Sequence, residues 1–175
     1  MKSQSLIGDG SNRKPEDFYP TPPYATQALL DREKFIGCVW EPACGEGHMS
    51  KVLLHNYFTI STDLIDRGYG TQKDFLSATD VHDNIITNPP FSLGLEFVLQ
   101  AKKLAKNKIA MLFKTQFLEG VGRQSMFLDT AFPLKCVYQF SKRLTFGGRS
   151  SGGMLAFAWF VWDKKHVGPA TIGWI

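Results

Sequence analysis

Four consecutive residues, Asn88, Pro89, Pro90 and Phe91, follow the apolar segment 84–87 and form a pattern suited to chemistry on an amine. The nitrogen of an aromatic amine is a poor nucleophile because its lone pair is delocalised into the ring. The side-chain carbonyl of Asn88 and the backbone carbonyl of Pro89 can accept hydrogen bonds from its two N–H groups and favour the nucleophilic form in the transition state. Both prolines have a fixed φ and no N–H, so the turn is rigid and rich in acceptors. Phe91 can stack on a base drawn out of its helix.

A glycine-rich turn, from Glu41 to Gly47, follows the short apolar segment 38–40. Gly45 and Gly47 allow a ligand to approach the backbone at the positive end of the helix that comes next. The turn lacks the lysine of a phosphate-binding loop, and its acids would repel a pyrophosphate. It therefore favours a ligand with cationic groups, a ribose and no phosphate, and S-adenosylmethionine has these properties.

Two further acidic positions continue this pattern along the chain. Asp63 ends the predicted strand 57–64, where a carboxylate can accept hydrogen bonds from both ribose hydroxyls. Asp74 can accept from an adenine amino group, and Phe75 can cover the face of the ring. Taken singly, the glycines could be turn residues, Asp63 a helix cap and Phe75 a core residue. The order of turn, strand-end acid and Asp-Phe favours a binding site.

The segments around these motifs alternate between strand and helix patterns, which predicts an α/β fold. We expect a doubly wound, Rossmann-like, mostly parallel sheet of seven strands, with ligands at the carboxyl ends of the strands. The last two strands have no clear helix between them, which predicts an antiparallel hairpin at one end, joined by the loop 141–153. The predicted helices are 24–33, 48–56, 92–106 and 123–130, and the predicted strands are 38–40, 57–64, 74–76, 84–87, 109–113, 134–140 and 154–162.

The motifs together resemble those of the S-adenosylmethionine-dependent amino methyltransferases. The likeness is greatest to the DNA N6-adenine enzymes whose cofactor motif precedes the catalytic tetrad [D/N/S]-P-P-[F/Y/W]. It implies the class I methyltransferase fold and methyl transfer to N6 of a flipped adenine in DNA. The catalytic residues would be Asn88, Pro89, Pro90 and Phe91.

The resemblance also implies which residues hold S-adenosylmethionine. Tyr19 to Pro23 looks like the motif that holds the methionine part, with Thr21 on the carboxylate, and Asp63 corresponds to the ribose-binding acid. Segment 143–148 looks like a loop that helps to hold the flipped base. The expected cofactor-binding residues are Tyr19, Thr21, Glu41, Ala43, Gly45, Gly47, Asp63, Leu64, Asp74, Phe75 and Asn88.

Charge is unevenly distributed along the chain, whose net charge is +4. Residues 1–100 carry 8 Lys and Arg against 13 Asp and Glu, and residues 101–175 carry 12 against 3. A strongly basic half is typical of a surface that binds a polyanion, although a solvated face has the same composition. The expected nucleic-acid contacts are Phe91, Lys142, Arg143, Phe146 and Arg149.

The 175 residues suffice for one domain. We expect a flexible arm over residues 1–14 and a single catalytic domain over 15–175. No separate target-recognition domain is expected, as in small methyltransferases of bacteriophages and prophages. The chain has no apolar run near the ~20 residues of a membrane span, and its first residues lead us to expect no secretory signal. Its three cysteines match no disulfide or zinc framework. We therefore expect no membrane partner and no metal. We expect the protein to be located in the cytoplasm of a bacterium or of a phage-infected host cell.

Two alternatives to DNA methylation stay open on the sequence. Asn-Pro-Pro-Phe also suits methylation of an RNA base amine or of a protein glutamine, and the basic half favours a nucleic acid over a glutamine. A non-catalytic nucleic-acid-binding module on a methyltransferase fold is a third interpretation, opposed by intact Asn88, Gly45, Gly47 and Asp63. The sequence predicts neither the target site, nor the strandedness of the substrate, nor the oligomeric state.

Overall fold

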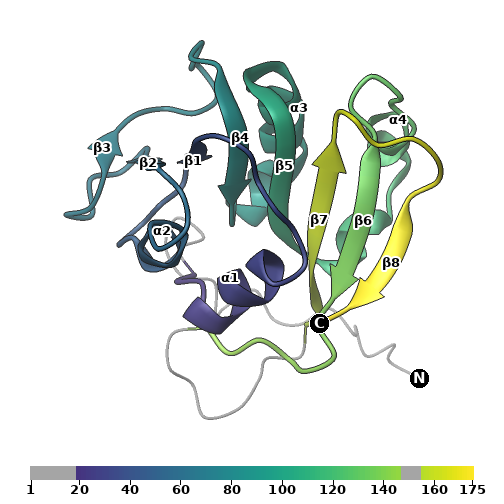
Figure 1. Cartoon of the computed structure of the whole chain (residues 1–175), viewed down its shortest axis with the longest axis horizontal. Helices are drawn as coiled ribbons and strands as arrows, with labels where there is room; N and C mark the ends of the chain where they lie inside the picture. The colour runs from purple at the N-terminus through teal and green to yellow at the C-terminus, as the bar shows by residue number, and fades with distance from the viewer. Residues whose placement is uncertain (1–18, 147–154) are drawn as a thin grey trace, which may run out of the picture.

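The computed structural model describes residues 19–146 and 155–175. Its centre is one mixed sheet with the strand order β3-β2-β1-β4-β5-β7-β6-β8 (Figure 1). Neighbouring strands are parallel from β3 to β5, whereas β7 runs antiparallel to both β5 and β6. The strands are β1 (Val39–Glu41), β2 (Thr59–Asp63), β3 (Thr71–Gln72), β4 (His82–Thr87), β5 (Ala105–Lys114), β6 (Leu134–Gln139), β7 (Phe157–Asp163) and β8 (Thr171–Trp174).

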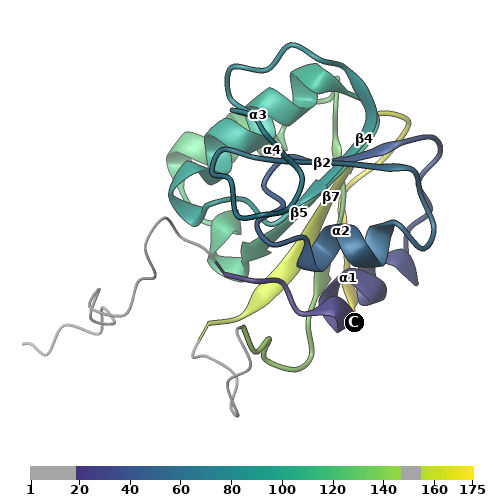
Figure 2. The ribbon, with the colours of Figure 1, turned by 90° about the vertical axis from the view of Figure 1, so that its left-hand side faces the viewer.

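Helices cover both faces of this sheet, as a doubly wound fold requires (Figure 2). One face carries α1 (Pro23–Leu30) and α2 (His48–Leu53), and the other carries α3 (Gly94–Leu104) and α4 (Gln124–Phe127). Alternate residues of β5 serve the two cores because successive strand side chains point to opposite faces. Ala110 and Leu112 pack with the α1 and α2 side, and Ile109 and Met111 pack with the α3 side.

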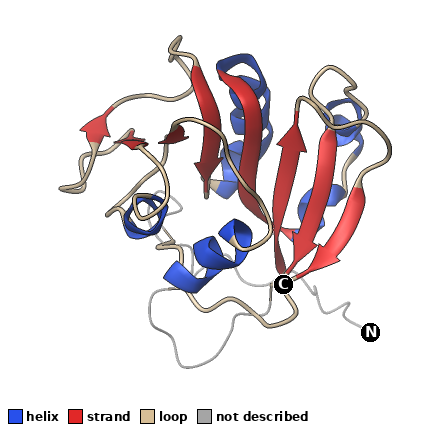
Figure 3. Ribbon diagram, viewed as in Figure 1, coloured by secondary structure: helices blue, strands red, loops and turns tan. Residues whose placement is uncertain are grey.

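The loops at the carboxyl ends of β1, β2 and β4 contain the motifs singled out in the sequence (Figure 3). The glycine-rich turn lies between β1 and α2, and Asp63 is the last residue of β2. Asn88 directly follows β4, and Phe91 begins a short 3-10 turn, Phe91–Leu93, that leads into α3. Because these three strands are parallel neighbours, all three loops meet at one edge of the sheet.

The fold class is the predicted one, but its elements differ from expectation in three respects. The predicted strand 74–76 is a turn, and the strand β3 precedes it. Asp74 accepts a hydrogen bond from the N–H of Leu76 at 2.9 Å, which closes a local turn in place of a ladder. The segment Thr171–Trp174 forms a strand that was not predicted, β8, which pairs parallel to β6. The sheet therefore has eight strands instead of seven. β7, the second strand of the predicted hairpin, lies between β5 and β6 and not at the edge of the sheet.

The third difference concerns helix lengths. Helix α3 begins at Gly94 and ends at Leu104, and β5 starts at the next residue. The predicted helix 123–130 is a single turn, α4, preceded by the 3-10 turn Val121–Arg123. Another 3-10 turn, Thr115–Leu118, follows β5. Among the described residues, no helix has the length and apolar character needed to cross a membrane. The arm expected at 1–14 lies outside the described residues, and the single domain 15–175 stays a prediction.

Candidate active site

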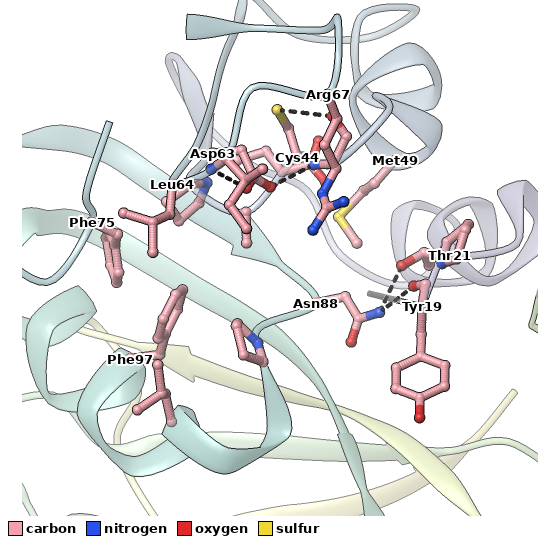
Figure 4. A pocket seen from close by; sticks show the side chains of 18 of the residues that line it. Tyr19, Thr21, Cys44, Met49, Asp63, Leu64, Arg67, Phe75, Asn88 and Phe97 are labelled. Carbon is pink, nitrogen blue, oxygen red and sulfur yellow. Dashed lines mark hydrogen bonds between the residues drawn. The ribbon is translucent and has the colours of Figure 1, made fainter. Parts of the chain in front are cut away.

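A cavity of about 590 Å³ opens where the loops after β1, β2 and β4 meet (Figure 4). Its size falls within the range of small-molecule and cofactor sites. Ten of the eleven residues expected to bind the cofactor line it: Tyr19, Thr21, Glu41, Ala43, Gly45, Asp63, Leu64, Asp74, Phe75 and Asn88. The structure therefore brings together residues that are up to 69 positions apart in the chain.

Gly47 is the expected residue that does not line the cavity, and it has a structural role in the turn. Its φ of 78° is left-handed, and it is the N-cap of α2. A Cβ atom at this position would lie 2.5 Å from the ring of Tyr69, so any side chain would collide with the loop that follows β2. Gly47 thus lets the β2–β3 loop pack onto the glycine-rich turn.

Asn88 has a fixed orientation, with its carbonyl oxygen uncommitted. Its Nδ2 donates to the backbone carbonyl of Tyr19 at 3.1 Å and to Oγ1 of Thr21 at 3.0 Å. Since a backbone carbonyl can only accept, the amide nitrogen must be the atom that faces Tyr19. Oδ1 is buried and has no hydrogen-bond partner among residues 19–146 and 155–175. A buried orphan acceptor is costly, and one at a cavity wall is suited to receive a ligand N–H.

Glu41 is buried at the floor of the cavity, with 2% of its surface exposed. Burial raises the pKa of its carboxyl to about 8, partly offset by the hydrogen bond that Ser50 donates to Oε2. Ser50 Oγ lies 2.5 Å from Ser61 Oγ, so Ser61 donates to Ser50 while Ser50 donates to Glu41. This chain of hydroxyls fixes the carboxyl in place. At neutral pH it holds a proton that a nearby ligand cation would displace.

Asp63 connects the two loops that it lies between. Its Oδ2 accepts from the N–H of Gly45 at 2.7 Å, and its Oδ1 accepts from the N–H of Ile65 at 3.0 Å. Each carboxylate oxygen has a second lone pair, so both remain able to accept from a diol. The expected ribose-binding acid therefore also positions the backbone of the glycine-rich turn.

Asp74 and Phe75 both line the cavity, and Phe75 lies at the opposite end of it from Thr21 (Figure 4). Asp74 is exposed, whereas Phe75 is only 2% exposed and packs against Trp40 and Phe97 with ring centroids 5.2 and 4.8 Å apart. Phe75 thus belongs to the core and to the cavity wall together. Phe97, which falls within the predicted helix 92–106, shares that wall.

The tetrad divides between two cavities. Pro90 and Asn88 line the larger one, and Phe91 lines a neighbouring cavity of about 180 Å³. Phe91 lies in an aromatic cluster with Tyr19, Phe146 and Phe157, whose neighbouring ring centroids are 4.9 to 6.0 Å apart. Pro89 is buried and lines neither cavity.

The expected nucleic-acid residues are described only in part. Lys142 and Arg143 are exposed, Phe146 packs in the aromatic cluster, and Arg149 lies outside the described residues. The basic residues at the Phe91 cavity are instead Lys114 and Arg123, which sequence reasoning missed. Lys114 Nζ lies 4.8 Å from the centroid of the Phe91 ring. The position of Lys114 at the end of the strand after the tetrad was the available signal.

The larger cavity also contains residues that carried no sequence signal. His48 and Met49 come from the start of α2, and Arg67 comes from the loop between β2 and β3. Arg67 extends its guanidinium into the cavity between Asp63 and Met49 (Figure 4). Within residues 19–146 and 155–175, no group of three or more His, Cys, Asp or Glu side chains could hold a metal ion.

Comparison with known proteins reveals likeness in structure only. No protein-family model matches the sequence, and no curated protein matches it. Among solved structures, a candidate RNA methyltransferase from Pyrococcus horikoshii has a TM-score of 0.64 at 17% identity, over 85% of this chain and 87% of that one. The modification subunit of a candidate type I restriction enzyme from Vibrio vulnificus has a TM-score of 0.63 at 15% identity, over 90% of this chain and 47% of that one.

A third similar structure is the magnesium protoporphyrin IX methyltransferase of Synechocystis with bound S-adenosylhomocysteine. Its TM-score is 0.54 at 13% identity, over 81% of this chain and 80% of that one. The chain spans about half the length of the Vibrio modification subunit. At these identities the likeness concerns the fold and leaves the substrate open. The chain has the class I S-adenosylmethionine-dependent methyltransferase fold, with its mostly parallel sheet and antiparallel β7.

Proposed function

We propose that this protein transfers a methyl group from S-adenosylmethionine to the exocyclic N6 amine of adenine in DNA. The observation that carries the proposal is the buried, unpartnered Oδ1 of Asn88. Its amide nitrogen is committed to Tyr19 and Thr21, so the oxygen is held where an amine can donate to it. Methylation of an aromatic amine needs such a hydrogen-bond acceptor. Most other groups that receive a methyl group do not need one.

The larger cavity fits S-adenosylmethionine in its chemical groups. Both oxygens of Asp63 can accept from a ribose, Phe75 and Leu64 offer apolar surface, and the buried Glu41 suits a cation. The orphan Oδ1 of Asn88 lies at the same cavity. S-adenosylmethionine would supply an electrophilic methyl group, which leaves its sulfonium by direct displacement without a strong general base.

The residues of the chain then act by positioning. Asn88 Oδ1 accepts a hydrogen bond from one N–H of the amine, the backbone carbonyl of Pro89 is available to accept from the other, and the rigid Pro-Pro turn keeps both acceptors fixed. As the N–C bond forms and the bond from sulfur to methyl breaks, the amine nitrogen becomes acidic and releases one proton to solvent. The Phe91 cavity is a place for the acceptor base, because the ring offers a stacking surface beside Asn88. Much of the rate enhancement would come from holding the donor and the acceptor in line.

Three observations favour a nucleic acid as the acceptor. The C-terminal 75 residues have a net charge of +9. Lys114 and Arg123 line the Phe91 cavity, and Lys142 and Arg143 are exposed just before Phe146 of the aromatic cluster. Basic and aromatic side chains together suit phosphate contact and base stacking. We infer that the methyl acceptor is an exposed base in DNA. The test below also includes RNA and protein glutamine as alternative methyl acceptors.

The test offers methyl-labelled S-adenosylmethionine with DNA of mixed sequence, ribosomal RNA or protein extract. Labelled N6-methyladenine in DNA is expected, with loss of at least about 100-fold in kcat for Asn88→Ala, comparable to removal of one transition-state hydrogen bond. Lys165→Ala, at an exposed residue outside both cavities, is the matched control and should retain full activity.

Each substrate arm gives a distinct result. If the label appears only in RNA or only in glutamine, that molecule and not DNA is the substrate. Full activity of Asn88→Ala would contradict the proposed role of Asn88 in binding the amine. Calorimetry that detects no binding of S-adenosylmethionine would favour the non-catalytic binding module.

A further inference from the structure

The loop between β5 and α4, residues 115–123, presents an apolar side chain to solvent beside the Phe91 cavity. β5 runs parallel to β4, so this loop leaves the sheet at the same edge as the proline-containing turn that follows β4. Phe117 and Arg123 of the loop line the Phe91 cavity. Val121 is 92% exposed and lies two residues before Arg123 in the chain. The loop therefore holds an uncovered apolar group near the place proposed for the acceptor base.

Arg123 fastens this loop to the core of the protein. Its Nε donates to the backbone carbonyl of Phe117 at 2.9 Å, and its Nη2 donates to the backbone carbonyl of Glu119. Phe117 is buried and stacks on Phe113 with ring centroids 3.9 Å apart. Val121 is thus carried on a loop whose two ends are fixed by packing and hydrogen bonds.

The two glycines that flank Val121 leave its side chain uncovered. Gly120 has a φ of 123°, which favours glycine, and a Cβ atom there would lie 2.8 Å from Arg123 Nη2. At Gly122 the Cβ position has no described heavy atom within 4 Å. The chain therefore turns at Gly120 and meets open space at Gly122.

The charges around the loop fit a nucleic acid. Residues 114–123 contain two basic side chains, Lys114 and Arg123, and one acid, Glu119. A duplex presents anionic phosphates on both sides of an apolar stack of bases. A surface with net positive charge and one projecting apolar side chain is complementary to such a partner.

Exposure alone does not single out Val121, because isolated apolar side chains are common on protein surfaces. Val167 is 93% exposed and lines neither cavity. Val121 differs from it in two respects, since its loop is fastened to the core and contributes two aromatic or basic walls, Phe117 and Arg123, to the Phe91 cavity. The two valines therefore form a matched pair for a test.

We propose that Val121 inserts into the base stack of double-stranded DNA, at the position that the target adenine leaves when it enters the Phe91 cavity. The inference rests on the proposed function and specifies its substrate as a duplex. Drawing a base out of a duplex costs pairing and stacking free energy, and an apolar side chain that fills the gap offsets part of this cost. In a single strand the base is already unpaired, so the side chain has little to replace.

Methyl transfer to one oligonucleotide in three forms tests the contact. The forms are a single strand, a perfect duplex, and a duplex in which a mismatched base faces the adenine. Val121→Ser should lower kcat/KM on the perfect duplex by about 10- to 100-fold, because unstacking one base step costs a few kcal/mol. It should change kcat/KM on the single strand by less than about threefold, and the loss on the mismatched duplex should be smaller than on the perfect one.

Two further variants separate this role from a loss of folding. Val121→Leu keeps an apolar side chain and should retain the activity of the wild type on the perfect duplex. Val167→Ser removes an equally exposed valine and should match the wild type on all three forms. Val121→Ser should unfold at the same urea concentration as the wild type, because its side chain packs little in the protein alone.

Each outcome distinguishes this inference from the proposed function. Equal losses of Val121→Ser on all three forms, or no loss on the perfect duplex, would overturn the role of Val121 and leave the proposed function standing. A wild type that methylates only single-stranded DNA would do the same. A wild type that methylates adenine in none of the three forms would overturn both.

Discussion

Substitution of Glu41 by Gln should remove a large pH dependence from the free energy of unfolding. Glu41 has a pKa of about 8 in the folded protein because burial disfavours its charge, against an ordinary value of 4.5. Between these values the folded state retains the proton and the unfolded state releases it. Stability must therefore fall as pH rises from about 4.5 to about 8, and the loss is complete above that range.

The magnitude follows from the two pKa values. A difference of about 3.5 pKa units, at about 1.36 kcal/mol each, corresponds to roughly 5 kcal/mol in full. Between about pH 5 and about pH 8, roughly 3 to 4 kcal/mol of this should be lost. Gln is of similar size, can still accept from Ser50, and does not titrate. The difference in unfolding free energy between the wild type and Glu41→Gln should shrink, and then change sign, as pH rises.

Urea denaturation across this pH range measures the effect. Glu46→Gln is the matched control, because Glu46 is an exposed acid in the same turn. Parallel pH profiles for the wild type and Glu41→Gln would refute the reasoning, since they would mean that the buried carboxyl does not titrate between the two states. Binding of a cationic ligand should also release up to about 0.9 proton near pH 7, measurable by calorimetry in buffers of different ionisation enthalpy.

Four further substitutions have defined outcomes. Asn88→Asp keeps an acceptor but cannot donate to Tyr19, so kcat should fall about tenfold in methyl transfer assays, and an undiminished rate would show the anchor to be dispensable. Gly47→Ala should destabilise more than Gly68→Ala in urea denaturation, because both have positive φ but only the first meets the Tyr69 ring; equal losses would leave no effect of the collision. Phe91→Ala should raise KM for the acceptor about tenfold while the Kd of S-adenosylmethionine stays constant, and a parallel rise in that Kd would contradict two separate cavities. Glu33→Gln should cost roughly 3 to 5 kcal/mol of unfolding free energy, because Glu33 is 1% exposed and is hydrogen-bonded to Lys108, Lys135 and Tyr138. A loss below about 1 kcal/mol would mean that this hydrogen-bond network is solvated.

Much of the larger cavity could be predicted because its residues are local in sequence to strand ends. A strand that is soon followed by Gly45 or Asn88, or that ends at Asp63, has a recognisable pattern. Parallel topology alone carries the loops after these strands to one edge of the sheet. The helices and strands that flank them follow from apolar periodicity. The fold class could therefore be inferred before any contact was known.

The remainder depends on contacts between distant segments. Arg67 lies in a polar loop of the kind that is usually solvated, and its place in the cavity is set by packing of Tyr69 against Gly47. Strand β8 is four residues long and mostly exposed, so it lacks the alternation of a half-buried strand and is defined by pairing with β6. The division of the tetrad between two cavities likewise depends on where Phe146 and Phe157 pack around Phe91.

The place of β7 between β5 and β6 has a consequence for how the chain folds. β5 ends at Lys114 and β7 begins at Phe157, so β5 exposes an unpaired edge until most of the chain has been synthesised. Apolar strand edges of this kind favour wrong pairing between chains. Folding is also slowed, because the long segment between β5 and β7 must close into a loop before the two strands can pair. Substitutions within β7 that weaken its ladder should therefore slow refolding and promote aggregation during synthesis, more than equally destabilising substitutions in β3 at the sheet edge. Pairing of β7 between β5 and β6 would be the step at which a nascent chain most needs protection.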